Sequence, residues 1–127
     1  MFTNIMYINL IVSDQDKALA FYTQLGFDKR IDYPGPENRF LTVGFKGQDV
    51  ELILMEGVTD TTEQPTDVTD AQNPGFLFIE SADLREACRA LAAGGVPFET
   101  EPVDYPWGVR ATVLDPDGNR VELRQRR

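Results

Sequence analysis

The sequence predicts an α+β fold built from two tandem modules, each with the order strand, helix and three strands. The first observation behind this prediction is that the same succession of hydrophobic periodicities occurs twice along the 127 residues. The second is that distinctive residues recur at nearly constant distances, with 69 residues from Asp14 to Asp83 and 71 from Glu51 to Glu122. Repeats of this length are too short to bury separate cores, so we expect the two modules to pack on one another.

Each element of the first module has a local signal. Residues 4–13, NIMYINLIVS, are rich in β-branched and apolar side chains, which favours a strand. Asp14 suits the N-cap of a helix over DQDKALAFYTQLG, and Gly26 suits its end. The turn signals PGPEN and KGQD then separate three predicted strands, at Phe27–Tyr33, Arg39–Phe45 and Val50–Met55.

The second module repeats these signals. The segment GFLFIES predicts a strand, Asp83 suits a second helix N-cap, and the pair Gly94-Gly95 suits the end of that helix. Three more strands are predicted, with DPDGN as the turn before the last of them: Phe98–Val103, Val109–Asp115 and Arg120–Gln125.

The stretch Glu56–Pro74 differs in character from the segments on either side. It is rich in acidic residues and threonine, contains no base and offers little that could pack, so it predicts a plain linker or a mobile lid. We therefore expect a single domain over residues 1–127, with modules at about 1–57 and 74–127 and a linker at about 58–73.

The composition limits the classes of function. The chain carries 21 acidic and 12 basic residues, a net charge of −9, which argues against nucleic-acid binding and is compatible with a cationic ligand. It contains no apolar run of membrane-spanning length and no basic signal-peptide region, so we expect a cytoplasmic protein with no membrane partner. The lone cysteine, Cys88, lies in a helical pattern and is predicted to be a small buried side chain.

The chain contains no histidine. This removes the usual metal ligand and the side chain best suited to proton transfer near neutral pH. It also leaves no Ser/His/Asp or Cys/His arrangement, and the chain has no glycine-rich phosphate loop. No local spacing favours acid–base chemistry by a pair of carboxylates.

Two glutamates stand out because each lies in the middle of a predicted strand. Glu51, in VELILM, lies on a strand whose two faces are otherwise apolar. A carboxylate in that setting needs a partner, either a ligand or a structural ion pair. Glu122 shares its face with Arg120 and Arg124, so it either belongs to a ladder of exposed opposite charges or contacts a ligand as the repeat partner of Glu51.

Aromatic residues mark further candidate positions. Tyr7 lies on the first strand, where it either belongs to the core or lines a pocket. In DYPWGVR, the residues Tyr105, Trp107 and Arg110 cluster around a proline and a glycine in a loop that leads into a strand. The only tryptophan of the chain can offer a flat face for stacking, and Arg110 can bind an anion or pair with Glu51.

Three segments carry a resemblance to a known family: VSDQDKALAFYTQLGF, GFLFIESADLREACRALAAGGVPFE and PWGVRATVLDPDGNRVELRQ. They resemble the vicinal oxygen chelate superfamily, which includes glyoxalase I, bleomycin-resistance proteins, fosfomycin-resistance enzymes and extradiol dioxygenases. The resemblance covers nearly the whole chain. It implies two βαβββ modules, each a curled mixed sheet, around a concave cleft, and usually a homodimer.

The resemblance also implies where metal ligands would lie. In the metal-dependent members the last ligand is the glutamate of the closing VEL, which is Glu122 here, and in glyoxalase-like members a second glutamate falls at Glu51. The two histidines of that set fall on Tyr7 and on Phe76, or on Gly75 if the register slips by one residue. Two carboxylates without nitrogen ligands hold divalent cations poorly, so we expect no metal and no other cofactor.

The first functional hypothesis is therefore a metal-free protein that binds a cationic or aromatic small molecule. Its expected ligand contacts are Tyr7, Glu51, Phe76, Tyr105, Trp107, Arg110 and Glu122. The alternative is a glyoxalase-like lyase or isomerase, or a dioxygenase-related enzyme, in which Glu51 and Glu122 are catalytic and hold a divalent metal weakly.

Overall fold

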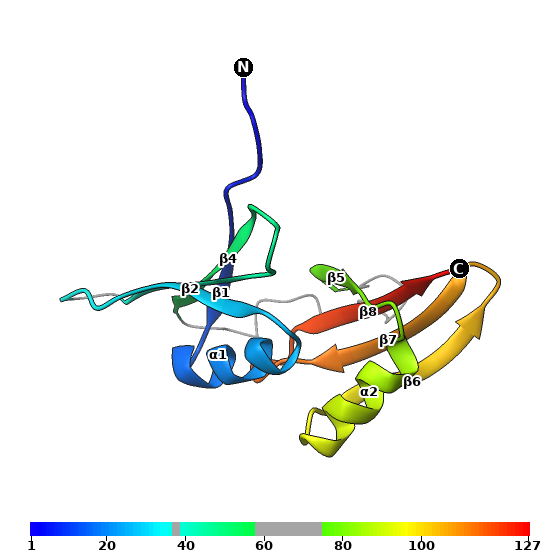
Figure 1. Cartoon of the computed structure of the whole chain (residues 1–127). Helices are drawn as coiled ribbons and strands as arrows, with labels where there is room; N and C mark the ends of the chain where they lie inside the picture. Colours follow the sequence, from blue (N-terminus) through cyan, green and yellow to red (C-terminus); the bar gives the residue numbers. More distant parts are fainter. Residues whose placement is uncertain (37–38, 58–74) are drawn as a thin grey trace, which may run out of the picture. The chain divides into compact units, whose positions relative to one another are not determined.

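The computed structural model describes residues 1–36, 39–57 and 75–127, and the chain divides into two compact units, Met1–Thr61 and Thr62–Arg127 (Figure 1). In the described residues, each unit holds one helix and one four-stranded mixed sheet. The predicted α+β fold class is confirmed. We call residues 1–57 the first module and residues 75–127 the second; most of the predicted linker, Glu56–Pro74, lies outside the described residues.

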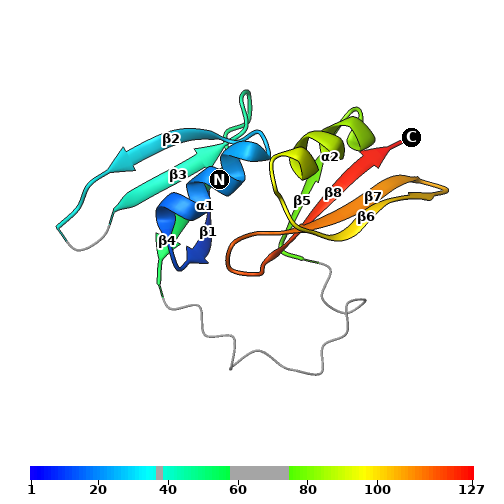
Figure 2. The same cartoon turned by 90° about the horizontal axis from the view of Figure 1, so that it is seen from below.

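The first module is a mixed sheet with a helix on one face. Its elements are β1 (Tyr7–Val12), α1 (Gln15–Gln24), β2 (Asp28–Tyr33), β3 (Phe40–Gly44) and β4 (Glu51–Glu56). The strands lie in the order β1-β4-β3-β2, with β1 parallel to β4 and the other neighbours antiparallel. Helix α1 lies across one face of this sheet (Figure 2).

Strand alternation sends one set of apolar side chains toward α1. The buried residues of this face are Leu10, Val12, Leu41, Val43, Leu52 and Leu54. They pack with buried Ala18, Phe21 and Tyr22 of the helix. The predicted helix start is confirmed, because the Asp14 carboxylate accepts a hydrogen bond from the Lys17 backbone N–H at 3.0 Å.

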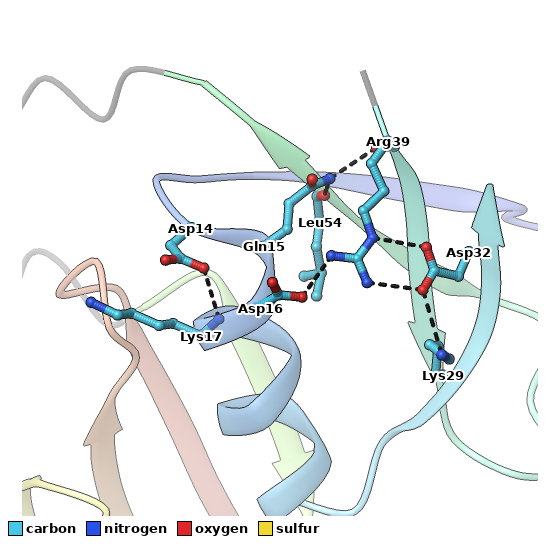
Figure 3. Close-up of polar contacts among 8 residues, drawn as sticks. All are labelled: Asp14, Gln15, Asp16, Lys17, Lys29, Asp32, Arg39 and Leu54. Atoms are coloured by element: carbon cyan, nitrogen blue, oxygen red, sulfur yellow. Dashed lines mark hydrogen bonds and ion pairs between the residues drawn. The ribbon is translucent and has the colours of Figure 1, made fainter. Parts of the chain in front are cut away.

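Polar contacts fix the first turn of α1 to the sheet (Figure 3). The buried side-chain amide of Gln15 donates to the carbonyl oxygens of Arg39 and Leu54 at 2.9 and 2.8 Å. The Arg39 guanidinium donates to both carboxylate oxygens of Asp32, each at 2.8 Å, and to Asp16 at 2.7 Å. This fork joins β2, the segment before β3 and the helix start.

The second module has the same architecture. Its elements are β5 (Leu77–Glu80), α2 (Leu84–Ala93), β6 (Phe98–Tyr105), β7 (Gly108–Leu114) and β8 (Arg120–Arg126). The strands lie in the order β5-β8-β7-β6, which matches the first sheet, and the pair β5 and β8 is again parallel. All predicted helices and strands are present, with strand ends shifted by three residues or fewer.

The core of the second module lies between its sheet and α2. Buried Leu84, Cys88 and Leu91 of the helix face the sheet, whose buried apolar residues are Val109, Ala111, Val113, Val121 and Leu123. The Asp83 carboxylate accepts from the Glu86 backbone N–H at 3.2 Å, so this predicted N-cap is also confirmed. Cys88 is buried as predicted, and burial raises the pKa of its thiol.

Within the described ranges, no helix combines the length and the apolar character that crossing a membrane requires.

The fork at Arg39 predicts an acid-dependent stability. Hydrogen bonds from Arg39 lower the pKa of Asp32 from 3.8 to about 2. The stabilisation is therefore complete above the ordinary pKa of the carboxyl and is lost as pH falls through about 2. We expect Asp32→Asn to lower the urea midpoint at pH 6, and the gap from the unmodified protein to narrow between about pH 4 and pH 2.

The control is Asp49→Asn, because the Asp49 side chain is exposed. Its curve of urea midpoint against pH is expected to run parallel to that of the unmodified protein. A gap for Asp32→Asn that stays constant down to pH 2 would contradict the role given to this carboxylate.

Candidate functional site

The two glutamates occupy equivalent positions in the two sheets. In the parallel pair of the first module, Tyr7 lies opposite Glu51, and in that of the second, Phe78 lies opposite Glu122. Phe78, and not the predicted Phe76, is therefore the counterpart of Tyr7. Phe76 precedes β5 and is 41% exposed. The reason is that Phe78 lies five residues before the N-cap Asp83, whereas Tyr7 lies seven residues before Asp14, so the helix spacing misplaces this position by two residues.

Glu51 has polar partners within its own module. Its Oε1 accepts from the Thr42 hydroxyl at 2.6 Å, and that hydroxyl accepts in turn from the Ile31 backbone N–H at 3.1 Å. Its Oε2 lies 3.5 Å from Nη1 of Arg30, a residue at the β-bulge of β2 that also donates to the carbonyl oxygen of Phe45. The sequence left open whether Glu51 contacts a ligand or forms a structural ion pair. The structure contains the ion pair, with Arg30.

Tyr7 is half-buried on the same face of the sheet as Glu51. Its ring meets that of Phe40 edge-on, with centroids 5.9 Å apart. Ile11 and Met55, further along this face, are 51% and 41% exposed. The face that carries Tyr7 and Glu51 therefore also presents apolar side chains and is partly open.

Glu122 is buried, whereas Arg120 and Arg124 on either side of it in the sequence suggested an exposed position. Its side chain is fully buried, because β8 lies between β5 and β7 in the sheet. The prediction of an exposed charge ladder with Arg120 and Arg124 is therefore wrong. Arg120 pairs instead with Glu99 on β6, at 2.5 and 2.8 Å.

The partner of Glu122 is Arg110 on the adjacent strand β7. Nε and Nη2 of Arg110 donate to the two carboxylate oxygens of Glu122 at 2.8 and 2.9 Å, and the Thr112 hydroxyl lies 3.4 Å from Oε1. Hydrogen bonding to Glu122, and secondarily to Tyr105, raises the pKa of the Arg110 guanidinium against the opposing effect of burial. Arg110 is therefore held by Glu122 within its own module and does not stand ready for an external anion.

Beside this pair, four side chains form a continuous stack. The rings of Tyr105 and Trp107 are nearly parallel, at 6°, with centroids 5.4 Å apart. The Arg124 guanidinium lies 4.6 Å from the Trp107 ring centroid and 5.0 Å from that of Phe78. Both distances are within the range of cation–π attraction.

A tight turn presents Trp107 to this stack. Tyr105 pairs with Gly108 across a hairpin whose two turn residues are Pro106 and Trp107. The Trp107 carbonyl accepts from the Arg127 backbone N–H at 3.1 Å. Gly108 has a φ of 154°, and a Cβ there would lie 1.9 Å from the Gln125 carbonyl oxygen, so only glycine lets the turn approach β8 this closely.

Three members of the stack, Phe78, Trp107 and Arg124, line a pocket of about 270 Å³ in the second module. Its walls are Phe78, Ile79, Glu80, Trp107, Arg124 and Arg126. Phe78 and Trp107 are 51% and 42% exposed, so about half of each side chain remains open beside the contacts already described. The structure thus brings together predicted Tyr105, Trp107, Arg110 and Glu122, and adds Phe78 and Arg124.

A second pocket of about 260 Å³ lies between α2 and β6. Its two arginines are engaged, since Arg85 pairs with Asp104 at 3.0 Å and Arg89 with Glu86 at 2.7 Å. Cys88 lines it, but a raised thiol pKa makes this side chain a poor nucleophile. The aromatic pocket is the better candidate for a functional site.

Comparison with known proteins agrees with the two-module architecture. The model of the Glyoxalase/Bleomycin resistance protein/Dioxygenase superfamily matches residues 4–123. The chain belongs to this superfamily.

Several known proteins resemble the chain over nearly its whole length. The crystal structure of UcmS2 matches with a TM-score of 0.78 and 32% identity, over 98% of both chains. That of TnmS3, an antibiotic binding protein from Streptomyces sp. CB03234, gives 0.76 and 32%, over 99% of this chain and 98% of that one. A lactoylglutathione lyase of Neisseria meningitidis serogroup A is 29% identical, over 97% of this chain and 91% of the lyase.

The donor set does not fit the divalent metal that the resemblance to metal-dependent superfamily members implies. Both oxygens of Glu122 accept from Arg110, whose fixed positive charge lies where a cation would bind. Tyr7 and Phe78, opposite Glu51 and Glu122, supply a phenol and a hydrocarbon ring in place of imidazole. Within the described ranges, no three acidic or cysteine side chains are grouped to hold a metal ion.

The buried pair predicts a large asymmetry between single and double substitutions. Arg110→Met leaves the Glu122 carboxylate buried without its guanidinium, so we expect the free energy of unfolding to fall by about 3 kcal/mol. The double variant Arg110→Met, Glu122→Leu removes both charges and is expected to recover most of that loss. Urea unfolding of the three proteins measures the difference.

The matched control is Arg126→Met, since Arg126 forms the same kind of fork with Glu80 but is 80% exposed. Its effect on stability is expected to be much smaller, because solvent screens exposed pairs. Two results would contradict the claim that the buried Glu122 carboxylate depends on Arg110. One is an equal loss of unfolding free energy for Arg110→Met and Arg126→Met. The other is a double variant no more stable than Arg110→Met.

Proposed function

We propose that this superfamily member binds a small organic molecule without a metal, at the aromatic pocket of the second module. One observation carries the proposal. The glutamate expected to serve as metal ligand or base, Glu122, gives both oxygens to Arg110, while Phe78 and Trp107 beside it keep open aromatic surface.

The pocket has the features of a ligand site. Apolar surface comes from Phe78, Ile79 and Trp107, and polar groups come from Glu80, Arg124 and Arg126. Tyr105 and Gly108 hold Trp107 in place, so its ring is ordered before a ligand arrives. The ion pair of Arg110 and Glu122 links strands β7 and β8 beside the pocket.

The comparisons support a binding role. TnmS3 binds an antibiotic, and the present chain shares 32% of its residues over nearly its whole length. In the first module Tyr7 and Glu51 stay predicted ligand contacts, on a face that also presents apolar side chains and is partly open. The homodimer and the cytoplasmic location that we expect from the sequence also stay predictions.

The second candidate is a lyase or isomerase of the glyoxalase type. It is favoured by the 29% identity to the Neisseria lactoylglutathione lyase. In such an enzyme Glu122 would act as a base, and to do so it would have to leave the Arg110 guanidinium that now covers both its oxygens. The binding role needs no such rearrangement.

The experiment is a calorimetric titration of metal-stripped protein with a panel of planar aromatic compounds. We expect saturable binding that added Zn²⁺, Ni²⁺ or Mn²⁺ does not strengthen. Trp107→Ala should weaken binding by at least about tenfold, as expected for an aromatic side chain at the centre of a contact surface.

Tyr33→Ala is the matched control, because Tyr33 is an aromatic residue of the first module that is 68% exposed. This variant is expected to bind as the unmodified protein does. Binding that appears only with added metal, or turnover of a substrate that Glu122→Gln abolishes, would favour the enzyme over the binding protein.

A further inference from the structure

We infer that the aromatic pocket selects an organic anion, bound through the N–H groups of Arg124, and not the cation that the net charge suggests. The inference rests on the proposed function and deepens it, because it names the chemical class of the ligand at the same pocket.

The first argument is the pairing of charges around the pocket. Arg126 donates to both carboxylate oxygens of Glu80, at 2.5 and 2.7 Å, and Arg110 does the same for Glu122. Glu122 lies two positions before Arg124 on β8, and Glu80 lies opposite Arg124 on the neighbouring strand β5. Both carboxylates are therefore held by arginines other than Arg124. Arg124 makes only a longer ion pair with Glu122, at 3.7 Å, and no hydrogen bond to either carboxylate.

The second argument is that the donors of Arg124 are incompletely satisfied. Its Nε is buried and has no hydrogen-bond partner in the described part of the chain. It lies 3.7 Å from Oε2 of Glu122, too far for a hydrogen bond, and that oxygen already accepts from Arg110. The rings of Phe78 and Trp107 attract the guanidinium charge, but they do not replace the oxygen acceptors that its five N–H groups need.

The third argument excludes the opposite charge. A cationic ligand would seek the same aromatic surface that Arg124 already occupies, so it would meet a like charge or have to displace the side chain. The net charge of −9 acts mainly at long range, where salt screens it beyond roughly 8 Å. At the pocket itself, the Arg124 guanidinium, which no carboxylate holds by hydrogen bonds, decides the preferred sign of the ligand charge.

The class of ligand follows from the walls of the pocket. An oxyanion such as a carboxylate matches the guanidinium geometry and can accept two parallel hydrogen bonds. The exposed surfaces of Phe78 and Trp107 suit a flat apolar group attached to it. The structure therefore assigns a planar aromatic acid as the preferred kind of ligand.

The test uses three probes of the same shape: cinnamate, cinnamamide and the cinnamylammonium ion. Calorimetry gives each dissociation constant, and quenching of Trp107 fluorescence places the probe, since Trp107 is the only tryptophan of the chain. We expect cinnamate to bind about tenfold or more tightly than cinnamamide, and cinnamylammonium to bind most weakly, because hydrogen bonds to charged groups are stronger than neutral ones.

Arg124→Gln is expected to abolish the preference for cinnamate over cinnamamide, and Arg124→Lys to restore part of it. Arg120→Gln is the matched control, because that arginine lies on the same strand, is bound to Glu99 and does not line the pocket, and it should leave the preference unchanged. The thermal midpoint of each variant shows that it is folded at the titration temperature.

The outcomes separate the inference from the function on which it rests. Equal binding of the three probes, or tightest binding of cinnamylammonium, overturns the anion preference and leaves the pocket as a binding site. A cinnamate preference that Arg124→Gln does not change overturns the role of Arg124. Failure of all three probes to bind or to quench Trp107 overturns the proposed pocket, and the anion preference with it.

Discussion

The buried carboxylate of Glu122 is the constraint on which the second module depends. A charge in the middle of a four-stranded sheet must be paired, and Arg110 on the adjacent strand supplies the pairing through two hydrogen bonds. Two arginines approach this one carboxylate, but only Arg110 lies within hydrogen-bond distance of its oxygens. Arg124 lies over the rings of Phe78 and Trp107, and this placement gives the pocket its chemistry.

The first module meets the same constraint with a different arrangement. The threonine that contacts the glutamate recurs, since Thr42 donates to Glu51 as Thr112 approaches Glu122. The arginine does not recur at the equivalent place: Arg30 reaches Glu51 from β2, where a bulge redirects it, at 3.5 Å. Glu51 also keeps 17% of its side-chain surface exposed, so its charge is less dependent on the guanidinium. The internal repeat therefore preserves the need for a counter-charge but not the residue that supplies it.

The contrast between these arrangements explains what the sequence could and could not predict. N-caps such as Asp14 and Asp83, and turn residues, act over a few positions, so the order and approximate bounds of the elements could be predicted from local patterns. The partner of Glu122 is twelve positions away on another strand, and the strand pairing that brings Arg110 there is a property of the sheet. The helix spacing leads to Phe76 in place of Phe78 for a related reason: it does not report that Phe78 lies two residues nearer to its helix than Tyr7 does. The spacing of 71 between the two glutamates, applied to Tyr7, would have led to Phe78.

The lack of histidine is thus only part of what separates this chain from metal-dependent relatives. A divalent cation at Glu122 would have to share both carboxylate oxygens with the Arg110 guanidinium, whose positive charge would repel it. Arg110 supplies, as a covalent part of the protein, the positive charge that a bound metal would otherwise bring to this carboxylate. Imidazole donors at Tyr7 and Phe78 would leave that competition unchanged, since the guanidinium would still cover both oxygens. The same pairing that removes Glu122 from metal chemistry also leaves Arg124 without a carboxylate of its own, so the loss of one chemistry and the gain of an anion-selective surface have a common physical origin.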